Sequence, residues 1–328
     1  MRAAVITRPG GPEVLEIQDR PVPEPSEGEI LVRVRATALN RADLLQREGQ
    51  YPAPPGAPSD IPGLEFAGEI VGTGAGVSEW NVGDRVFGIV AGGGNAELLV
   101  TDARAVAHIP STLSWTDAAA IPEVFITAHD ALVTQAGVRR GERVLIHAVG
   151  SGVGLAATQL ARSWNAIPFG TARTADKIAR ARDYGLENGV VVADDVDAIV
   201  AAVERWAGGK GMDVTLDLVA GPYLGASIRA AALKGRIILI GTIAGRSATI
   251  PVGMVLGKRL TLRGTVLRAR TIEEKRSVTA AFARDVVPLL GAGALRPVVD
   301  RVYALDEIRA AHERLASNET FGKIVLKV

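Results

Sequence analysis

Three glycines at alternate positions, Gly150, Gly152 and Gly154, interrupt the end of an aliphatic run. Residues of high helix propensity follow, and their apolar positions recur three to four residues apart. The pattern predicts a strand, a tight turn and a helix. Glycine lets backbone N–H groups approach an anion closely, and the positive end of the helix favours a diphosphate. The candidates for binding a dinucleotide cofactor here are therefore the three glycines with Ser151 and Val153.

Strand and helix patterns alternate around this turn, from residue 143 to residue 264, as in a doubly wound parallel sheet of the α/β class. Further strands are predicted at residues 167–171, 190–192, 212–219 and 236–241, and helices at 174–184, 195–207 and 223–233. The glycine spacing differs from the usual G-x-G-x-x-G, so a packing turn that binds no ligand is the alternative. The alternation favours the cofactor interpretation.

The residues on either side have a different pattern. Short β-rich runs separated by Pro/Gly turns predict a mostly β domain, with strands at 3–6, 30–38, 66–71 and 85–90. Residues 40–47 read as a short helix capped by Asn40, and residues 114–137 as a helical bridge. The C-terminal part reads as a helix at 271–290, a strand at 301–303, a helix at 305–315 and a strand at 323–328. We expect it to pack back on the first domain, which would then comprise residues 1–118 and 266–328 around a nucleotide domain of residues 119–265.

Composition limits the class of protein. A chain of 328 residues is long enough for two domains. Its net charge of +1 with no long basic run predicts no nucleic-acid partner and no membrane surface. The absence of cysteine removes disulfides, thiolate nucleophiles and thiolate metal ligands. No signal peptide or membrane-spanning run is predicted, so the expected location is cytoplasmic.

The end of the second predicted strand of the nucleotide domain bears on the choice of cofactor. NAD-selective domains place an acid there to bind the ribose 2′-hydroxyl, whereas this chain has Arg173. Asp176 lies a turn later, where the helix dipole explains it. Lys177 lies in the same turn, where a cation is unfavourable unless an anion is nearby. A 2′-phosphate would be that anion, so we predict NADPH; the alternative is that both cations are ordinary surface residues.

Several short motifs together resemble the zinc-free quinone oxidoreductases of the medium-chain dehydrogenase/reductase superfamily. They are GGPEVL at 10–15, LNRADL at 39–44, GDRV at 83–86, IPE at 121–123, SGVG at 151–154 and GKIVL at 322–326. The resemblance covers the whole chain, and QREGQY at 46–51 is similar to the branch typified by the tumour-suppressor-inducible quinone oxidoreductase. It implies a GroES-like catalytic domain, an inserted Rossmann domain, NADPH as cofactor and a homodimer joined through the edge of the nucleotide sheet.

The resemblance also implies that no metal is bound. Zinc-dependent relatives have a cysteine where this chain has Asn40 and a histidine where it has Leu64. Those relatives have a further ligand near Glu123, and a lone carboxylate cannot build the three-ligand open site that zinc catalysis uses. The four cysteines that hold the structural zinc of those relatives are missing as well.

Family positions supply the remaining site residues. For the cofactor they are Thr127, Gly241 and Thr242 beside the nicotinamide, Lys177 with Arg173 at the 2′-phosphate, and Lys323. A tyrosine that often accompanies the phosphate is replaced by Val192. On the substrate side the candidates are Asn40, Asp43, Tyr51 and Arg268.

Tyr51 offers a ring for stacking and a hydroxyl for a carbonyl oxygen, although a loop tyrosine packed on prolines is an equal alternative. Asn40 and Asp43 also fit the roles of helix cap and first-turn acid. No tight acid–base constellation is visible in the sequence, and quinones need less help from a general acid than ketones do. The predicted activity is NADPH-dependent reduction of quinones or conjugated carbonyls. The alternatives are reduction of the C=C bond of enones or alkenals, and an NADPH-binding protein with little turnover.

Overall fold

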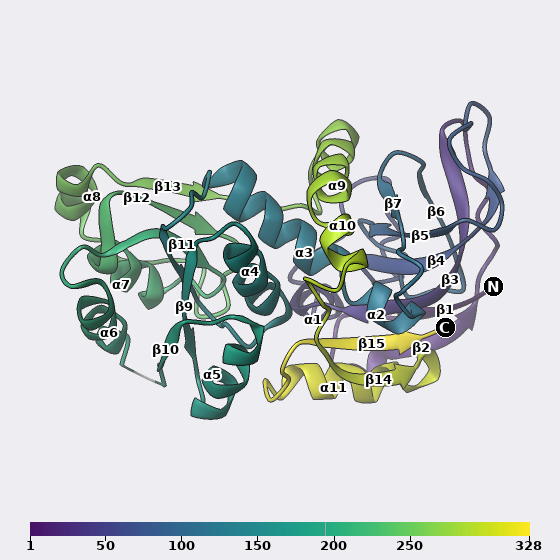
Figure 1. Cartoon of the computed structure of the whole chain (residues 1–328). Coiled ribbons are helices and arrows are strands. Elements are labelled where there is room, and N and C mark those ends of the chain that lie inside the picture. Colours follow the sequence, from purple (N-terminus) through teal and green to yellow (C-terminus); the bar gives the residue numbers. More distant parts are fainter. Residues whose placement is uncertain (194) are drawn as a thin grey trace. The chain divides into compact units, whose positions relative to one another are not determined.

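The computed structural model describes residues 1–193 and 195–328, and the chain divides into two compact units (Figure 1). The first unit consists of Met1–Ile126 together with Leu267–Val328, and the second of Thr127–Val266. We refer to them as the discontinuous unit and the nucleotide unit. Among the described residues, no helix is long and apolar enough to cross a membrane.

The nucleotide unit is built on a six-stranded parallel sheet. The strands, in their order across the sheet, are β10 (Asn188–Val191), β9 (Ile167–Ala172), β8 (Arg143–Ile146), β11 (Met212–Asp217), β12 (Ala231–Leu239) and β13 (Thr261–Gly264). The chain moves outward from β8 to β10 and then crosses to β11 on the other side of β8. This reversal of strand order beside β8 is the place where open α/β sheets bind ligands.

Helices cover both faces of this sheet, which explains why its central strands are apolar throughout. Figure 1 shows α4 and α5 on one face and α6 and α7 on the other. The bounds are α4 (Gly152–Ser163), α5 (Ala175–Ala181), η3 (Arg182–Tyr184), α6 (Asp197–Ala207), α7 (Pro222–Ala230) and α8 (Val252–Lys258). Val144, Leu145 and Ile146 of β8 are completely buried. The glycine turn therefore follows a rigid central strand.

The discontinuous unit contains a two-stranded antiparallel pair and a larger sheet of seven strands. The pair is β1 (Arg2–Ile6) with β2 (Leu15–Asp19); the larger sheet comprises β3 (Glu29–Leu39), β4 (Glu65–Thr73), β5 (Arg85–Ile89), β6 (Leu98–Asp102), β7 (Val106–His108), β14 (Val299–Ala304) and β15 (Lys323–Lys327). The C-terminal β15 pairs antiparallel with β3, and Ile324 lies opposite Leu39. This register brings the start of β15 beside the end of β3.

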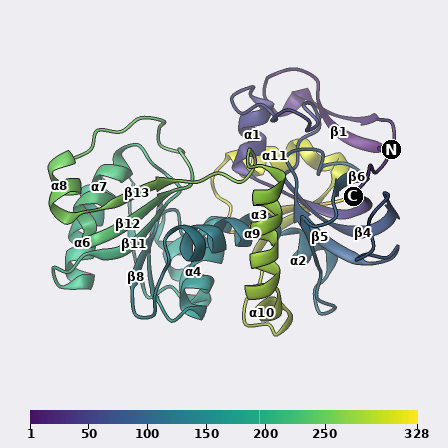
Figure 2. The same cartoon turned by 90° about the horizontal axis from the view of Figure 1, so that it is seen from above.

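The helices of the discontinuous unit are short apart from α9. They are η1 (Pro12–Val14), α1 (Arg41–Arg47), α2 (Trp115–Ala119), α9 (Ile272–Asp285), α10 (Val287–Gly291), η4 (Leu305–Glu307) and α11 (Ile308–Ala316), while α3 (Pro122–His129) and η2 (Asp130–Gln135) follow α2. Figure 2 shows α9 continuing into α10. Core clusters lie under α11, where Leu305, Ile308 and Ile324 are buried, and within the sheet, where Phe66 and Ile70 are buried.

The predicted fold class is confirmed: the nucleotide unit is a doubly wound parallel sheet and the other unit is mostly β. One predicted boundary is wrong, because the helix expected at 223–233 ends at Ala230 and the next strand begins at Ala231. Alanine favours helix, but Ala231 and Ala232 are buried in the sheet, where packing overrides propensity. Strands β2, β6, β7 and β13 were not predicted.

Candidate active site

The glycine turn leads directly into α4, a helix of 12 residues. Ser151 is its N-cap, and the Ser151 Oγ accepts a hydrogen bond of 3.1 Å from the backbone N–H of Gly154. The amides of Gly152 and Val153 belong to the same first turn, where helix geometry provides no intrahelical acceptor. Two backbone donors and the positive end of the helix dipole are therefore available for a diphosphate.

Steric limits explain Gly154, whereas Gly150 has the flexible side chain of Lys177 beside it. A Cβ on Gly154 would lie 2.5 Å from the carbonyl oxygen of Ala148, so no larger residue fits without moving the turn. A Cβ on Gly150 would lie 3.0 Å from Cδ of Lys177. The side-chain stem of Lys177 therefore lies alongside the turn, which brings the predicted phosphate-binding lysine next to the predicted diphosphate site.

The other predicted cofactor residues lie on neighbouring elements. Arg173 is exposed just after β9, and its charge opposes the rise that burial causes in the pKa of Tyr223 on α7. Thr127 lies on α3 and is 9% exposed, whereas Gly241 and Thr242 follow β12. The residues of the turn with Lys177 are thus brought together, while contacts of Arg173, Thr127, Gly241 and Thr242 with a cofactor stay predictions.

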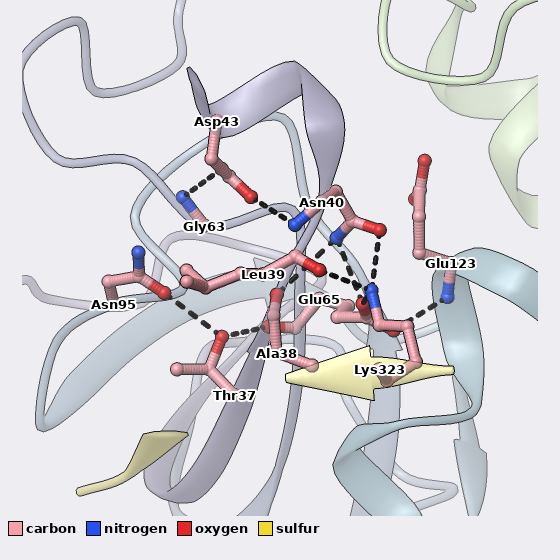
Figure 3. Close-up of polar contacts among 10 residues, drawn as sticks. All are labelled: Thr37, Ala38, Leu39, Asn40, Asp43, Gly63, Glu65, Asn95, Glu123 and Lys323. Atoms are coloured by element: carbon pink, nitrogen blue, oxygen red, sulfur yellow. Dashed lines mark hydrogen bonds and ion pairs between the residues drawn. The ribbon is translucent and has the colours of Figure 1, made fainter. Parts of the chain in front are cut away.

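A buried polar network forms where β3 meets α1 in the discontinuous unit (Figure 3). Glu65, which is completely buried, accepts hydrogen bonds from Asn40 Nδ2 at 2.9 Å and from the backbone N–H of Glu123 at 2.8 Å. Lys323 Nζ lies 2.8 Å from Glu65 Oε1 and donates to Asn40 Oδ1 and to the carbonyl oxygen of Leu39. Every charged group buried here therefore has a bonded partner, as burial requires.

Asp43, in the first turn of α1, supports this network. One oxygen of its carboxyl accepts from the N–H of Asn40 at 2.7 Å, and the other accepts from the N–H of Gly63 at 3.1 Å. Burial raises the pKa of Asp43 to about 6, an effect that the two amides and Lys323 oppose. Asp43 is completely buried, so the structure gives it a positioning role, and its predicted contact with substrate stays a prediction.

Lys323 was predicted to bind the cofactor. Lys323 is 4% exposed, and its ammonium has three protein oxygens as partners. The pairing of β15 with β3 places it beside Asn40. In the structure Lys323 thus holds the polar network together, and a contact with cofactor stays a prediction.

Glu123 differs from the other acids of this region. Its backbone is tied to Glu65, but its carboxyl extends beyond the network and carries no dashed contact in Figure 3. Among the residues 1–193 and 195–328, no hydrogen bond or ion pair reaches that carboxyl. Burial, then Glu65 and Asp43, raise the pKa of Glu123 to about 8, against the opposing charges of Lys323 and Arg268. A partly accessible carboxyl that is protonated at neutral pH can donate a proton.

Tyr51 and Arg268, which are both predicted to bind the substrate, lie next to each other. The Arg268 guanidinium lies 4.9 Å from the centre of the Tyr51 ring, and its Nη1 donates to the Tyr51 carbonyl oxygen at 3.1 Å. Gln46 accepts from Arg268 Nη2 at 2.6 Å. Arg268 is 5% exposed, so it fixes the Tyr51 loop from within the unit.

Sequence reasoning missed Glu65, Glu123 and Gln46. Glu123 belongs to the IPE motif and Gln46 to the string QREGQY, but neither was predicted to be a site residue. Glu65 has no distinctive signal, because only the pairing of β4 and β15 with β3 brings it to Asn40 and Lys323. Within the described part of the chain, no group of three or more His, Cys, Asp or Glu could hold a metal ion.

Two family profiles match this chain. The profile described as an alcohol dehydrogenase GroES-like domain matches residues 26–111, and the one described as a zinc-binding dehydrogenase matches residues 185–326. They fall mainly on the discontinuous unit and on the nucleotide unit with the C-terminal part, respectively.

Relatives match over the whole length. A quinone oxidoreductase of Lama guanicoe is 34% identical over 331 residues, which cover 99% of this chain and 97% of the relative. The structure of Escherichia coli quinone oxidoreductase complexed with NADPH matches with a TM-score of 0.90 and 28% identity, covering 100% of both chains. The JamJ enoyl reductase matches with a TM-score of 0.88 and 25% identity, covering 99% of both.

Proposed function

The chain belongs to the quinone oxidoreductases of the medium-chain dehydrogenase/reductase superfamily, and from this premise we propose that it reduces quinones with NADPH, without a metal ion. The observation that carries the proposal is the turn at residues 150–154, which presents free helix N–H groups beside Lys177. The steric limit at Gly154 and the cap at Ser151 support a backbone site for a diphosphate.

The choice of NADPH is supported by the charges beside the turn. Lys177 packs along Gly150, and Arg173 is exposed at the end of β9, where an NAD-selective protein would have an acid. Two cations at that place suit a 2′-phosphate. The similar quinone oxidoreductase of Escherichia coli has a structure in complex with NADPH, which supports the same choice of cofactor.

When bound, the cofactor supplies a hydride, and the chain must supply a proton. We assign that proton to Glu123. Its O–H bond breaks as a new O–H bond forms on the reduced acceptor, and solvent then reprotonates the Glu123 carboxylate. The carboxyl suits this role because burial and the neighbouring Glu65 keep its pKa near 8. The network of Asn40, Glu65 and Lys323 fixes the backbone of Glu123 during the step.

Tyr51 is the proposed platform for the acceptor. Its ring is supported by Arg268 on one side, and the hydrogen bond from Arg268 to the Tyr51 carbonyl oxygen fixes the loop. A planar, electron-poor quinone would stack on such a ring with little reorganisation. The exposed fraction of Tyr51 is intermediate, so the residue is accessible from solvent.

Steady-state assays test the proposal. Purified protein in the presence of a chelator is mixed with NADPH or NADH and a panel of ortho- and para-quinones. We expect consumption of NADPH well above the rate without protein, a lower kcat/KM with NADH, and a fall in rate at pH values above the pKa of Glu123. A preference for NADH, or rates no higher than without protein, would overturn the proposal.

Reduction of the C=C bond of enones is the second candidate. The similarity to the JamJ enoyl reductase over nearly the whole of both chains favours it. The same hydride and proton would then be added to carbon atoms. Identification of the product from a conjugated enone separates the two reactions, because only the second candidate gives the saturated ketone. Tight NADPH binding without consumption of any acceptor would instead indicate a binding protein.

A homodimer is part of the proposed assembly. Helix α8 carries the exposed apolar side chains Val252, Met254 and Leu256, and exposed Val266 follows the edge strand β13. An uncovered sheet edge beside exposed apolar residues favours pairing with a second copy. Analytical ultracentrifugation of the protein and of Leu256→Glu tests this, since a dimer should dissociate on that substitution. A monomeric wild-type protein would contradict it.

A further inference from the structure

A pocket of about 450 Å³ lies in the discontinuous unit, beside the Tyr51 loop. Four parts of the chain line it: the proline-rich loop at 54–58, the end of β5 with residues 89–92, residues of β6 and the following turn, and the segment from Arg268 to Lys275. The proline-rich loop is stiff, because proline fixes its own backbone and restricts the preceding residue. The pocket is thus a preformed part of the unit.

The charges of this pocket are all of one sign. Its ionisable lining residues are Arg268, Arg270 and Lys275, and no lining residue is acidic. Such an arrangement favours an anion, because clefts lined by one sign of charge concentrate the opposite charge.

Among these cations, Arg268 is buried. Its guanidinium donates to the carbonyl oxygen of Ala91 at 2.8 Å, to that of Tyr51 and to Gln46 Oε1, all of which are neutral acceptors. The hydrogen bonds are satisfied, but none of the residues that the structure describes provides a bonded carboxylate to compensate the charge. The charges of two acids, Asp43 and Glu123, act on Arg268 without a hydrogen bond or ion pair to it, and Glu123 is itself kept protonated at neutral pH. A buried cation without a bonded counter-ion is unusual, since buried charges are generally paired.

Lys275 adds a second uncompensated charge. It lies on the first turns of α9, and no hydrogen bond or ion pair connects its ammonium to any residue that the structure describes. Burial, and then the charge of Arg268, lower the pKa of Lys275. An anion placed in the pocket would provide a counter-charge to Lys275 and to Arg268 together.

We propose that the pocket binds an anionic group, a carboxylate, sulfonate or phosphate, carried by the acceptor whose ring stacks on Tyr51. Arg268 connects the two places, since it lines the pocket and lies over the Tyr51 ring. The preferred acceptor is therefore a planar conjugated carbonyl compound with an acidic substituent. The inference rests on the proposed function for the identity of the ring, but the anion site itself needs no turnover.

Binding without cofactor tests the site directly. Isothermal titration compares a naphthoquinone sulfonate with the parent naphthoquinone, and a benzene sulfonate serves as the anion without a quinone. We expect the sulfonated quinone to bind about tenfold more tightly than the parent, in the range of one charge-assisted contact, and the preference to fall as salt is added.

Two matched variants remove one lysine each. In Lys275→Gln the preference for the sulfonate over the parent should fall about tenfold. In Lys327→Gln, an equal change of charge at an exposed position of β15, it should be retained. Equal binding of the sulfonate and its parent, or an equal loss in both variants, overturns the anion site.

The same ligands separate this inference from the proposed activity. If the sulfonated quinone binds through Lys275 but is not reduced with NADPH, the proposed function fails and the anion site stands. If both quinones are reduced with equal kcat/KM and bind equally, the activity stands and the anion site fails. Binding of the benzene sulfonate alone, as tightly as the quinone, would show that the ring does not use Tyr51 and would refute the combined site.

Discussion

The two units build their polar sites from different materials. In the nucleotide unit the site is one contiguous stretch, residues 150–154, and its donors are backbone N–H groups at the start of α4. In the discontinuous unit the site is made of side chains, and its members Asn40, Glu65, Glu123 and Lys323 come from four separate elements. The turn depends on a glycine position that leaves no room for a Cβ atom. The side-chain network depends on buried charged groups that must keep their partners.

This difference predicts how each site fails. A backbone site tolerates changes of its neighbours but not a Cβ at a crowded glycine. A buried side-chain network tolerates neutral replacement of a complete pair but not the loss of one partner. Substitutions in the side-chain network should therefore mainly lower stability. Substitutions in the glycine turn should mainly lower the affinity for the cofactor.

The largest effect is expected from Lys323→Met. This change leaves the carboxylate of Glu65, completely buried, without its ammonium partner. Loss of one member of a buried ion pair costs about 3–5 kcal/mol of the free energy of unfolding. Urea unfolding of the variant measures it, and Lys327→Met, at an exposed position of the same strand, is the control.

The double variant Lys323→Met with Glu65→Gln sharpens this test. It removes both charges, so it should recover part of the lost stability. A single variant Lys323→Met within about 1 kcal/mol of the wild type would show that the network is not what holds the site.

Gly154→Ala should have the next largest effect, and on the other unit. Its Cβ would lie 2.5 Å from the Ala148 carbonyl oxygen, so the turn must move. We expect a loss of about 2–3 kcal/mol in stability and a loss of NADPH affinity that exceeds that of Lys323→Met. Calorimetric titration and thermal unfolding measure both. Gly253→Ala in α8, where a Cβ meets nothing within 4 Å, is the matched control.

Glu123→Gln should change the pH dependence of stability. Burial raises the pKa of Glu123 from 4.5 to about 8, so the folded state holds this proton more tightly than the unfolded state. The free energy of unfolding therefore falls as the pH rises from 4.5 to about 8, and the full contribution of the protonated Glu123 is present only below pH 4.5. The glutamine has no such loss, so the variant should gain about 2 kcal/mol on the wild type between about pH 6 and pH 9. Parallel pH dependence in urea unfolding would contradict this.

The smallest effect concerns the 2′-phosphate. Lys177→Gln should weaken NADPH binding about tenfold and leave NADH binding nearly unchanged, because only NADPH carries the phosphate. Lys210→Gln, an exposed lysine of the same unit, should change neither affinity. An equal loss for both cofactors would place Lys177 at the diphosphate instead, and no loss would make it a surface cation.

The same comparison explains how much the sequence could predict. The turn at 150–154 is local, so the alternation of strand and helix was enough to place it, and the helix capped by Asn40 was recognised for the same reason. The polar network depends on which strands pair. Lys323 and Glu65 are far apart in the chain, and only the register of β15 and β4 on β3 brings them together. Glu123 could be quoted in a motif, but its raised pKa is a property of burial and neighbours that no spacing reveals.

A single-turnover experiment tests the central claim most directly. Protein treated with chelator is loaded with one equivalent of NADPH and mixed rapidly with a naphthoquinone, while absorbance follows the cofactor. The account predicts that the bound NADPH is consumed in one fast phase and that an equal amount of hydroquinone forms. Bound NADPH that persists at the rate seen without protein, or that is consumed only after zinc is added, would contradict it.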